Sequence, residues 1–140
     1  MSNTPILAKI IEKAALEQIT SYLTLNNLQS NSQSACKKGH SYETAVLKVV
    51  NDIQEEINKN NMIILLMLDL SAAFDTIDQD ILLAKLERYF GIYDKVLAFL
   101  RSFLKERTYS VIIGDLKSRK KLLSCGVPQG SIIAPLLFAL

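Results

Sequence analysis

The sequence predicts an α/β fold in which amphipathic helices pack on a small sheet. Apolar residues recur at helical spacing in the stretches 4–24, 42–59, 79–90 and 94–106. One unbroken apolar run, 62–69, has the length of a strand rather than of a helix. A chain of 140 residues that is 49% hydrophobic can also bury one core without a metal or a disulfide.

The first two helices are predicted from one apolar face each. Residues 4–24 carry Leu7, Ile10, Ile11, Ala14, Ala15 and Ile19 on the expected face. Thr4 and Pro5 supply an N-cap and a first-turn proline. After a loop at 25–41 that is rich in Asn, Ser and Lys, the helix 42–59 shows Ala45, Val46, Val49, Val50, Ile53 and Ile57.

The apolar run from Met62 to Leu68 does not alternate, which predicts a strand covered on both faces, and it ends at Asp69. A carboxylate at the carboxyl end of such a strand projects into the crevice above the sheet, where it suits a hard cation such as Mg²⁺. The alternative is that Asp69 caps the turn after the strand. Further on, Asp78 is expected to cap the helix 79–90, and Asp80 to lie in its first turn.

The second half of the chain predicts helices around a hairpin. Gly91 closes the helix 79–90, and the helix 94–106 has a stripe of Val96, Leu97, Leu100, Phe103 and Leu104. The segments "TYSVIIG" (108–114) and "KKLLSCG" (120–126) predict the two strands, with "DLKSR" between them. A helix is expected from Ser131, with Pro135 near its first turn. Because this apolar stretch runs on to Leu140, we expect it to be exposed here and to pack against a further segment.

Composition excludes several classes of function. The net charge of +2 does not by itself indicate a nucleic-acid partner, and the one histidine excludes a multi-histidine metal site within this chain. Cys36 and Cys125 match no zinc spacing and predict free thiols in a reducing compartment, with a disulfide as the alternative. No run reaches the ~20 apolar residues of a membrane helix, and no secretory signal is visible, so we expect an intracellular protein of the nucleus or cytoplasm and no membrane partner.

Two polar features are candidates for binding. In "CGVPQGS" (125–131), Gly126 and Gly130 bracket Pro128-Gln129, which allows the backbone to approach something flat such as a base pair; the alternative is an ordinary hairpin-to-helix connection. Basic residues gather in two clusters, which predict phosphate contacts or a solvated helix end and hairpin turn. These clusters are Arg101, Lys105 and Arg107, and Lys117, Arg119, Lys120 and Lys121.

Taken together, "LDLSAAFDTID" and "LSCGVPQGSIIAPLLF" resemble two motifs of the reverse transcriptases of non-LTR, LINE-like retrotransposons of the jockey type. The stretches "SNTPILAKIIEKAALEQITSYL", "LQSNSQSACKKGHSYETAVLKVVNDI" and "YFGIYDKVLAFLRSFLKERTYSVIIG" resemble other parts of the same domain, in the same order. The resemblance implies a mixed or antiparallel palm sheet in an incomplete right-hand polymerase. It implies a fingers portion (1–61), a palm strand and helix (62–90), a linking helix and hairpin (91–126) and the start of the next helix (127–140).

The resemblance also implies roles for residues. Asp69, with the backbone carbonyl of Leu70, corresponds to the position that binds catalytic Mg²⁺ or Mn²⁺, and Asp75 has a supporting place nearby. Phe74 corresponds to the steric gate beneath the incoming sugar. Lys37 corresponds to the basic residue facing the triphosphate, where arginine is usual in the family.

Gln129 and Gly130 correspond to the turn at the nascent base pair, while Lys38 and His40 are further candidates beside the triphosphate. Gln79 and Ala134 depart from the family pattern, which commonly has histidine and glycine there.

The implied function is RNA-directed DNA polymerisation by a two-metal mechanism, with RNA template, DNA primer, dNTP and the rest of the polymerase domain as partners. In the family two further aspartates lie in a YADD-type hairpin that this sequence does not contain, so we expect no polymerisation by these residues alone. The alternatives are a domesticated or decaying remnant that binds RNA or a protein, and a product without function.

Overall fold

The computed structural model describes residues 5–37, 39–128 and 130–140. Within them, the helices are α1 (Ile6–Leu25), α2 (Tyr42–Asn58), α3 (Gln79–Arg88), α4 (Asp94–Leu104) and α5 (Ala134–Ala139). The short strands are β1 (Thr108–Tyr109), β2 (Ile112–Ile113), β3 (Leu116–Lys117) and β4 (Lys121–Leu122). The predicted α/β class is confirmed, with small antiparallel sheets.

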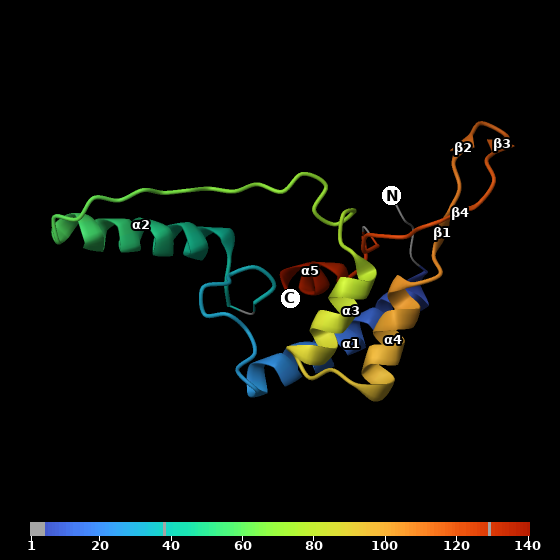
Figure 1. Ribbon diagram of the computed structural model, residues 1–140, viewed down its shortest axis with the longest axis horizontal. Coiled ribbons are helices and arrows are strands. Elements are labelled where there is room, and N and C mark those ends of the chain that lie inside the picture. Colours follow the sequence, from blue (N-terminus) through green and yellow to red (C-terminus); the bar gives the residue numbers. More distant parts are fainter. Residues whose placement is uncertain (1–4, 38, 129) are drawn as a thin grey trace.

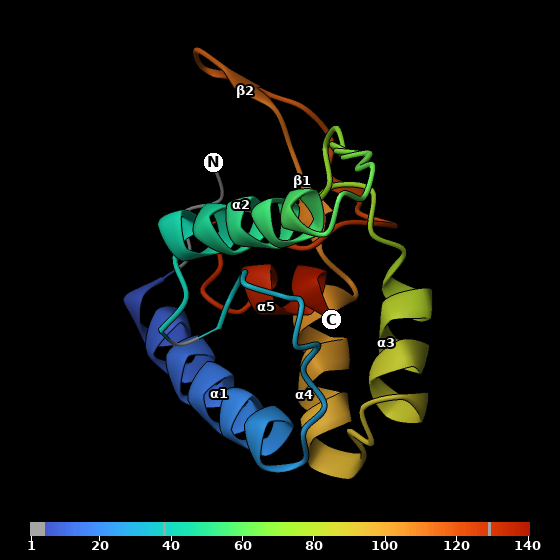
Figure 2. The same cartoon turned by 90° about the vertical axis from the view of Figure 1, so that its left-hand side faces the viewer.

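The hydrophobic core lies among α1, α3, α4 and α5, which are close together in both views (Figures 1 and 2). Leu23 on α1, Leu86 on α3 and Leu100 on α4 are fully buried. Each buried leucine stabilises the fold by about 1.5–3 kcal/mol relative to an exposed one. The stripe predicted for α4 is confirmed for Leu97, Leu100 and Leu104, whereas Val96 is exposed. Helix α4 packs against α3.

The buried face of α1 differs from the predicted one. Ile19 is buried as expected, but Leu7 and Ile10 are 75% and 60% exposed. The core-facing side instead includes Glu12 and Leu23. The reason is that the C-terminal half of α1 lies on the core, while its N-terminal apolar face meets no cover among the described residues. Thr4, the predicted cap, lies outside those residues, and Pro5 occupies the cap position without a side-chain bond.

Helix α2 is fixed by local hydrogen bonds rather than by burial. Ser41 and Thr44 form a reciprocal capping box at its start, with Thr44 N–H donating to Ser41 Oγ at 3.3 Å. No residue of α2 is buried, and Val46, Val49 and Val50 are exposed, so the predicted packing face is not used within the described residues. In Figure 1 this helix projects away from the others.

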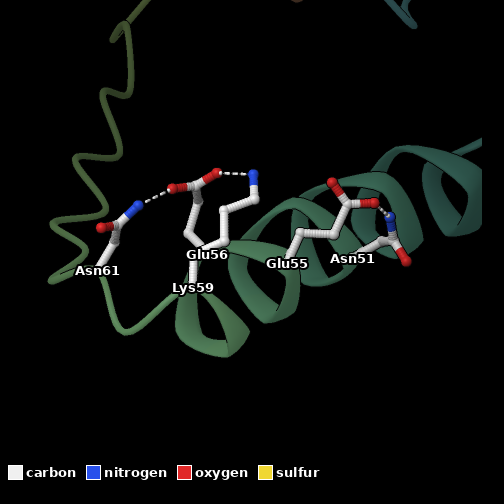
Figure 3. A network of polar contacts seen from close by, with 5 residues as sticks. All are labelled: Asn51, Glu55, Glu56, Lys59 and Asn61. Atoms are coloured by element: carbon white, nitrogen blue, oxygen red, sulfur yellow. Dashed lines mark hydrogen bonds and ion pairs between the residues drawn. The ribbon is translucent and has the colours of Figure 1, made fainter.

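The C-terminal end of α2 carries a network of polar contacts (Figure 3). Lys59 Nζ and Asn61 Nδ2 donate to the two carboxylate oxygens of Glu56, each at 2.6 Å, and Asn51 Nδ2 donates to Glu55 at 2.9 Å. The hydrogen bond from Lys59, and then that from Asn61, lower the pKa of Glu56 from its ordinary value of 4.5. These contacts therefore favour the charged form of Glu56 where the helix ends.

The strand predicted at 62–69 is wrong for this structure. Residues 61–70 form no regular element, and Met62 and Met67 are 93% and 82% exposed. Figure 1 shows the segment running alone from the end of α2 toward α3. A strand buried on both faces needs neighbouring strands for its backbone hydrogen bonds, and the described residues supply none beside it. We call residues 61–70 the extended segment.

The predicted hairpin is confirmed, but its turn lies earlier than expected. Strand β1 pairs antiparallel with β4, and β2 with β3, in the register Ile113↔Leu116. The tight turn is at Gly114, which has φ +58°, so the "DLKSR" segment contains strand β3 rather than only a loop. Ser118 Oγ accepts from Val111 N–H at 2.9 Å and joins the two short ladders.

Helix α5 buries the apolar stretch that we expected to be exposed. Leu136, Leu137 and Leu140 are at most 8% exposed, because they pack into the core beside α1, α3 and α4. Pro135 lies in the first turn, as predicted. Among the described residues, exposed apolar side chains lie instead on the N-terminal half of α1, on α2, on the extended segment and on the hairpin. Among the described residues, no helix is long and apolar enough to span a bilayer.

Candidate functional site

The two segments that were expected to form a site are joined by backbone hydrogen bonds. Val127 N–H donates to the carbonyl of Phe74 at 2.9 Å, and Gly126 N–H donates to that of Ile77 at 2.7 Å. Asp78 and Cys125 add an isolated antiparallel bridge. The turn after Asp69 and the Pro-Gln-Gly segment (residues 125–131) therefore form one unit, although they are far apart in sequence.

Gly126 explains why the two segments can lie this close. It has φ +83°, and a Cβ at this position would lie 3.1 Å from the Cα and carbonyl oxygen of Asp75 and from the carbonyl oxygen of Phe74. The close approach at Gly126 is therefore to the protein's own chain, whereas the approach of this segment to a base pair stays a prediction. Gln79, which is buried, donates from Nε2 to the carbonyl of Gly126 at 3.0 Å, a role that the sequence did not indicate.

Phe74 lies at the edge of this unit. Its half-buried ring contacts that of Phe138 on α5, with 5.1 Å between the ring centroids. The preceding turn is closed by Asp75 N–H, which donates to the carbonyl of Ala72 at 2.8 Å. The backbone of Phe74 is thus held beside the Pro-Gln-Gly segment, and its role as a steric gate stays a prediction.

Asp69 and Leu70 are exposed at the end of the extended segment. In the part of the chain that the structure describes, no group of three or more His, Cys, Asp or Glu residues could hold a metal ion. Asp69 alone therefore does not constitute a complete divalent-metal site, since such ions take several oxygen ligands.

The two neighbouring aspartates have structural roles. Asp78 caps α3 as predicted, its Oδ1 accepting from Asp80 N–H at 2.8 Å and from Ile81 N–H at 3.0 Å. Asp80 lies in the first turn of α3, also as predicted, and forms an ion pair with Lys105 at 2.6 Å.

The turn that follows Val127 is defined on both sides of position 129. Ser131 N–H donates to the carbonyl of Pro128 at 3.1 Å, and Gly130 has φ +85°. Gln129, assigned to the nascent base pair, lies outside the described residues. Glu12 of α1 also accepts hydrogen bonds from Ser131 and Ile132, a contact that sequence reasoning missed.

The basic candidates are distributed over two places. Lys37 lies within its own loop, where Nζ donates to the carbonyl of Ser30 at 3.5 Å, and His40 N–H donates to the carbonyl of Lys37 at 3.2 Å. Lys38 lies outside the described residues. These contacts are local, so they do not join Lys37 to the Pro-Gln-Gly segment.

The cations at the end of α4 share a groove of about 690 Å³. Arg101, Lys105 and Arg107 line it together with the acidic Asp94 and Glu106. Burial lowers the pKa of Arg107 below its ordinary value. Lys105 is ion-paired with Asp80, which leaves Arg101 and Arg107 as the candidate phosphate contacts of this groove.

Comparison with known proteins defines the class. Residues 1–140 match the family described as reverse transcriptase (RNA-dependent DNA polymerase), and the chain belongs to that family. The RNA-directed DNA polymerase from mobile element jockey of Drosophila melanogaster is 30% identical over 135 residues, which is 96% of this chain and 14% of that protein.

Two further Drosophila melanogaster proteins extend the comparison. The probable RNA-directed DNA polymerase from transposon BS is 25% identical over 95% of this chain, and that from transposon X-element is 27% identical over all of it. The chain spans 14% and 15% of their lengths. The resemblance to jockey-type retrotransposon reverse transcriptases is therefore confirmed.

Proposed function

We propose that this chain contributes the fingers and the first part of the palm to a retrotransposon RNA-directed DNA polymerase that transfers nucleotides by a two-metal mechanism. RNA template, DNA primer and dNTP are its substrates in that enzyme. Mg²⁺ or Mn²⁺ would neutralise charge on the triphosphate and would clamp the attacking and leaving oxygens. Asp69, with the carbonyl of Leu70, would supply this chain's share of the ligands.

The backbone joining of Phe74 to Val127 is the observation that supports this proposal most directly. Phe74 and the Pro-Gln-Gly segment lie side by side. Such an arrangement would suit two groups that contact the sugar and the base of the same nucleotide. Gly126 permits the approach, and Asp69 lies a short turn upstream. Lys37 is proposed to face the triphosphate, and Gln129 and Gly130 to face the nascent base pair.

The first experiment is primer extension on an RNA template by the purified 140-residue chain. We expect no incorporation, because the described residues assemble no complete metal site. Template-directed incorporation of dNTP would contradict that part of the proposal.

The second experiment titrates Mn²⁺ in the presence of dTTP against the wild type, Asp69→Ala and Asp52→Ala. Asp52 is an exposed aspartate on α2 and serves as the matched control. We expect weaker Mn²⁺ binding for Asp69→Ala alone. Equal binding by all three proteins would remove Asp69 from the proposed metal site.

A second function has its own supporting observation. The extended segment and α2 expose a large apolar surface, which fits a non-catalytic module that binds a protein, while the groove at Arg101 fits RNA. Binding of single-stranded RNA that is insensitive to Mn²⁺ and unchanged in Asp69→Ala would favour this module. For either function we propose the nucleus or cytoplasm as the location.

A further inference from the structure

Glu12 is a buried carboxylate in the middle of the fold. It lies on α1, is 3% exposed, and faces the start of the C-terminal helix rather than solvent. Its Oε2 accepts from the hydroxyl of Ser131 at 2.6 Å and from the backbone N–H of Ile132 at 2.7 Å. These bonds connect residues 119 and 120 positions apart in sequence, so they link α1 directly to the Pro-Gln-Gly segment.

Packing alone does not account for a glutamate at this place. Its second oxygen, Oε1, is buried and has no hydrogen-bond partner, which is unfavourable for a carboxylate. A methionine or leucine of similar volume would fill the same space without that cost. The two short bonds of Oε2 are therefore the feature that distinguishes Glu12 from an apolar residue.

Ser131, which is held by Glu12, is also hydrogen-bonded to residues on both sides of it in the chain. Its N–H closes the turn with the carbonyl of Pro128, and its Oγ accepts from Ile133 N–H at 3.2 Å and from Ala134 N–H at 3.3 Å. Because the Ser131 hydroxyl donates its hydrogen bond to Glu12, the lone pairs of Oγ are available to accept from these N–H groups. The turn and the first residues of α5 are thus oriented by one carboxylate.

The turn is held on its other flank by the unit described above. Before the turn, Val127 is hydrogen-bonded to Phe74, and Gly126 is hydrogen-bonded to Gln79. At the end of the turn, Glu12 accepts a hydrogen bond from Ser131. Val127 and Ser131 are therefore each hydrogen-bonded to another part of the chain, Val127 to Phe74 and Ser131 to Glu12 on α1.

We propose that Glu12 is a positioning residue that fixes the 128–131 turn from the side of α1. The link to nucleotide rests on the proposed function: where that turn faces the incoming dNTP, Glu12 sets its geometry through Ser131 and Ile132 without touching the substrate. A residue in this role should affect the turn and the nucleotide more than the stability of the whole chain.

The test is amide hydrogen exchange on the 140-residue chain, with Glu12→Ala, Glu12→Gln and the exposed Glu17→Ala as matched control. We expect exchange at Ile132 and Ala134 to rise at least tenfold in Glu12→Ala, and less in Glu12→Gln, whose amide oxygen still accepts. Core amides such as that of Leu100 should keep their rates. Unchanged exchange at Ile132, or an equal rise at Leu100, would overturn the proposal.

A second variant keeps the test decisive if Glu12→Ala does not fold. Ser131→Ala removes the hydroxyl from the other partner, and combining it with Glu12→Gln should raise exchange by less than the product of the single effects. If the two substitutions raise the exchange rates independently, so that their effects multiply, the result would count against a hydrogen bond between Glu12 and Ser131.

Binding of Mn²⁺ with dTTP, measured on the same proteins, separates this inference from the proposed function. We expect Glu12→Ala to weaken it several-fold and Glu17→Ala to leave it unchanged. Faster exchange at Ile132 with unaltered nucleotide binding would overturn the link to nucleotide. Equal nucleotide binding by wild type and Asp69→Ala would instead count against the proposed function, while the exchange pattern still decides the role of Glu12 at the turn.

Discussion

Gly126 is the residue on which the contact between the two candidate segments depends. Because a Cβ would lie 3.1 Å from backbone atoms of Phe74 and Asp75, and because φ is +83°, alanine here is both strained and obstructed. We expect Gly126→Ala to lower the free energy of unfolding by about 1–3 kcal/mol, measured by urea denaturation.

Gly39 provides the control for this substitution. It has a similar φ of +78°, but a Cβ there meets nothing within 4 Å. Gly39→Ala therefore isolates the cost of backbone strain from that of the close approach. A loss of stability in Gly126→Ala no larger than that in Gly39→Ala would show that the approach to Phe74 does not contribute.

Single residues differ in how far their roles could be read from sequence. The cap at Asp78 was predictable, because its partners are two and three residues away. Gln79 and Glu12 were not, because their partners lie 47 and 119 residues further along the chain. Glu12 lies on the same side of α1 as Ile19 and Leu23, and that side is buried. The sequence contains this spacing, but only the structure shows which side of α1 faces the core.

At the scale of elements, α2 depends on local polar contacts, and the contacts of Glu56 make its end sensitive to pH. In the folded chain, Lys59 and then Asn61 lower the pKa of Glu56 below 4.5, whereas in the unfolded chain the carboxyl titrates at its ordinary value. The stabilisation is therefore complete above that ordinary value, and it is lost as the pH falls through the lower, folded pKa.

We expect the last turn of α2 to fray as the pH falls through the lowered pKa of Glu56, seen as faster exchange or altered chemical shifts at Asn58 and Lys59. Glu56→Gln should show the frayed end already at neutral pH and no further change on acidification. Glu55→Gln is the control, since its bond comes from Asn51 within the helix. Identical acid responses of the wild type and Glu56→Gln would contradict the prediction.

Elements whose determinants are local were predicted correctly, and the one that needs distant partners was not. The helices at α3 and α4 follow from their apolar periodicity and caps, and the hairpin from its β-branched residues around a glycine. The run from Met62 to Leu68 has the composition of a buried strand, but composition supplies no neighbouring strand. In the described residues it remains extended and exposed.

At the scale of the whole molecule, exposed apolar residues lie on the extended segment, α2, the N-terminal half of α1 and the hairpin, and of these the extended segment has no regular secondary structure. A run of exposed apolar residues with unpaired backbone is prone to pair with another chain. We expect the 140-residue chain to associate as its concentration rises, measured by sedimentation velocity, and Leu66→Lys to shift the distribution toward monomer.

Leu25 gives the matched control for this effect. It is 82% exposed, against 77% for Leu66, but it stands at the end of α1, outside the extended segment. Leu25→Lys should change association less, and neither variant should alter thermal stability, because neither leucine is in the core. Equal effects of the two substitutions would show that association does not depend on the extended segment.

The charge distribution predicts how the molecule meets nucleic acid. The net charge of +2 gives little long-range attraction, so binding should depend on the groove where Arg101 and Arg107 gather at the end of α4. Each phosphate contact that is removed should reduce the slope of log K against log salt by roughly one.

We expect Arg101→Gln to lower that slope by about one unit for an RNA–DNA primer-template duplex, with little dependence on its sequence, and Lys48→Gln on α2 to leave it unchanged. Arg107→Gln tests the half-buried member, where glutamine retains part of the packing of the side chain. If Lys121→Gln in the hairpin lowers the slope and Arg101→Gln does not, the contact surface is the hairpin rather than the groove. In that case the nucleic acid would contact the β1–β4 strand pair, where Lys121 pairs with Tyr109.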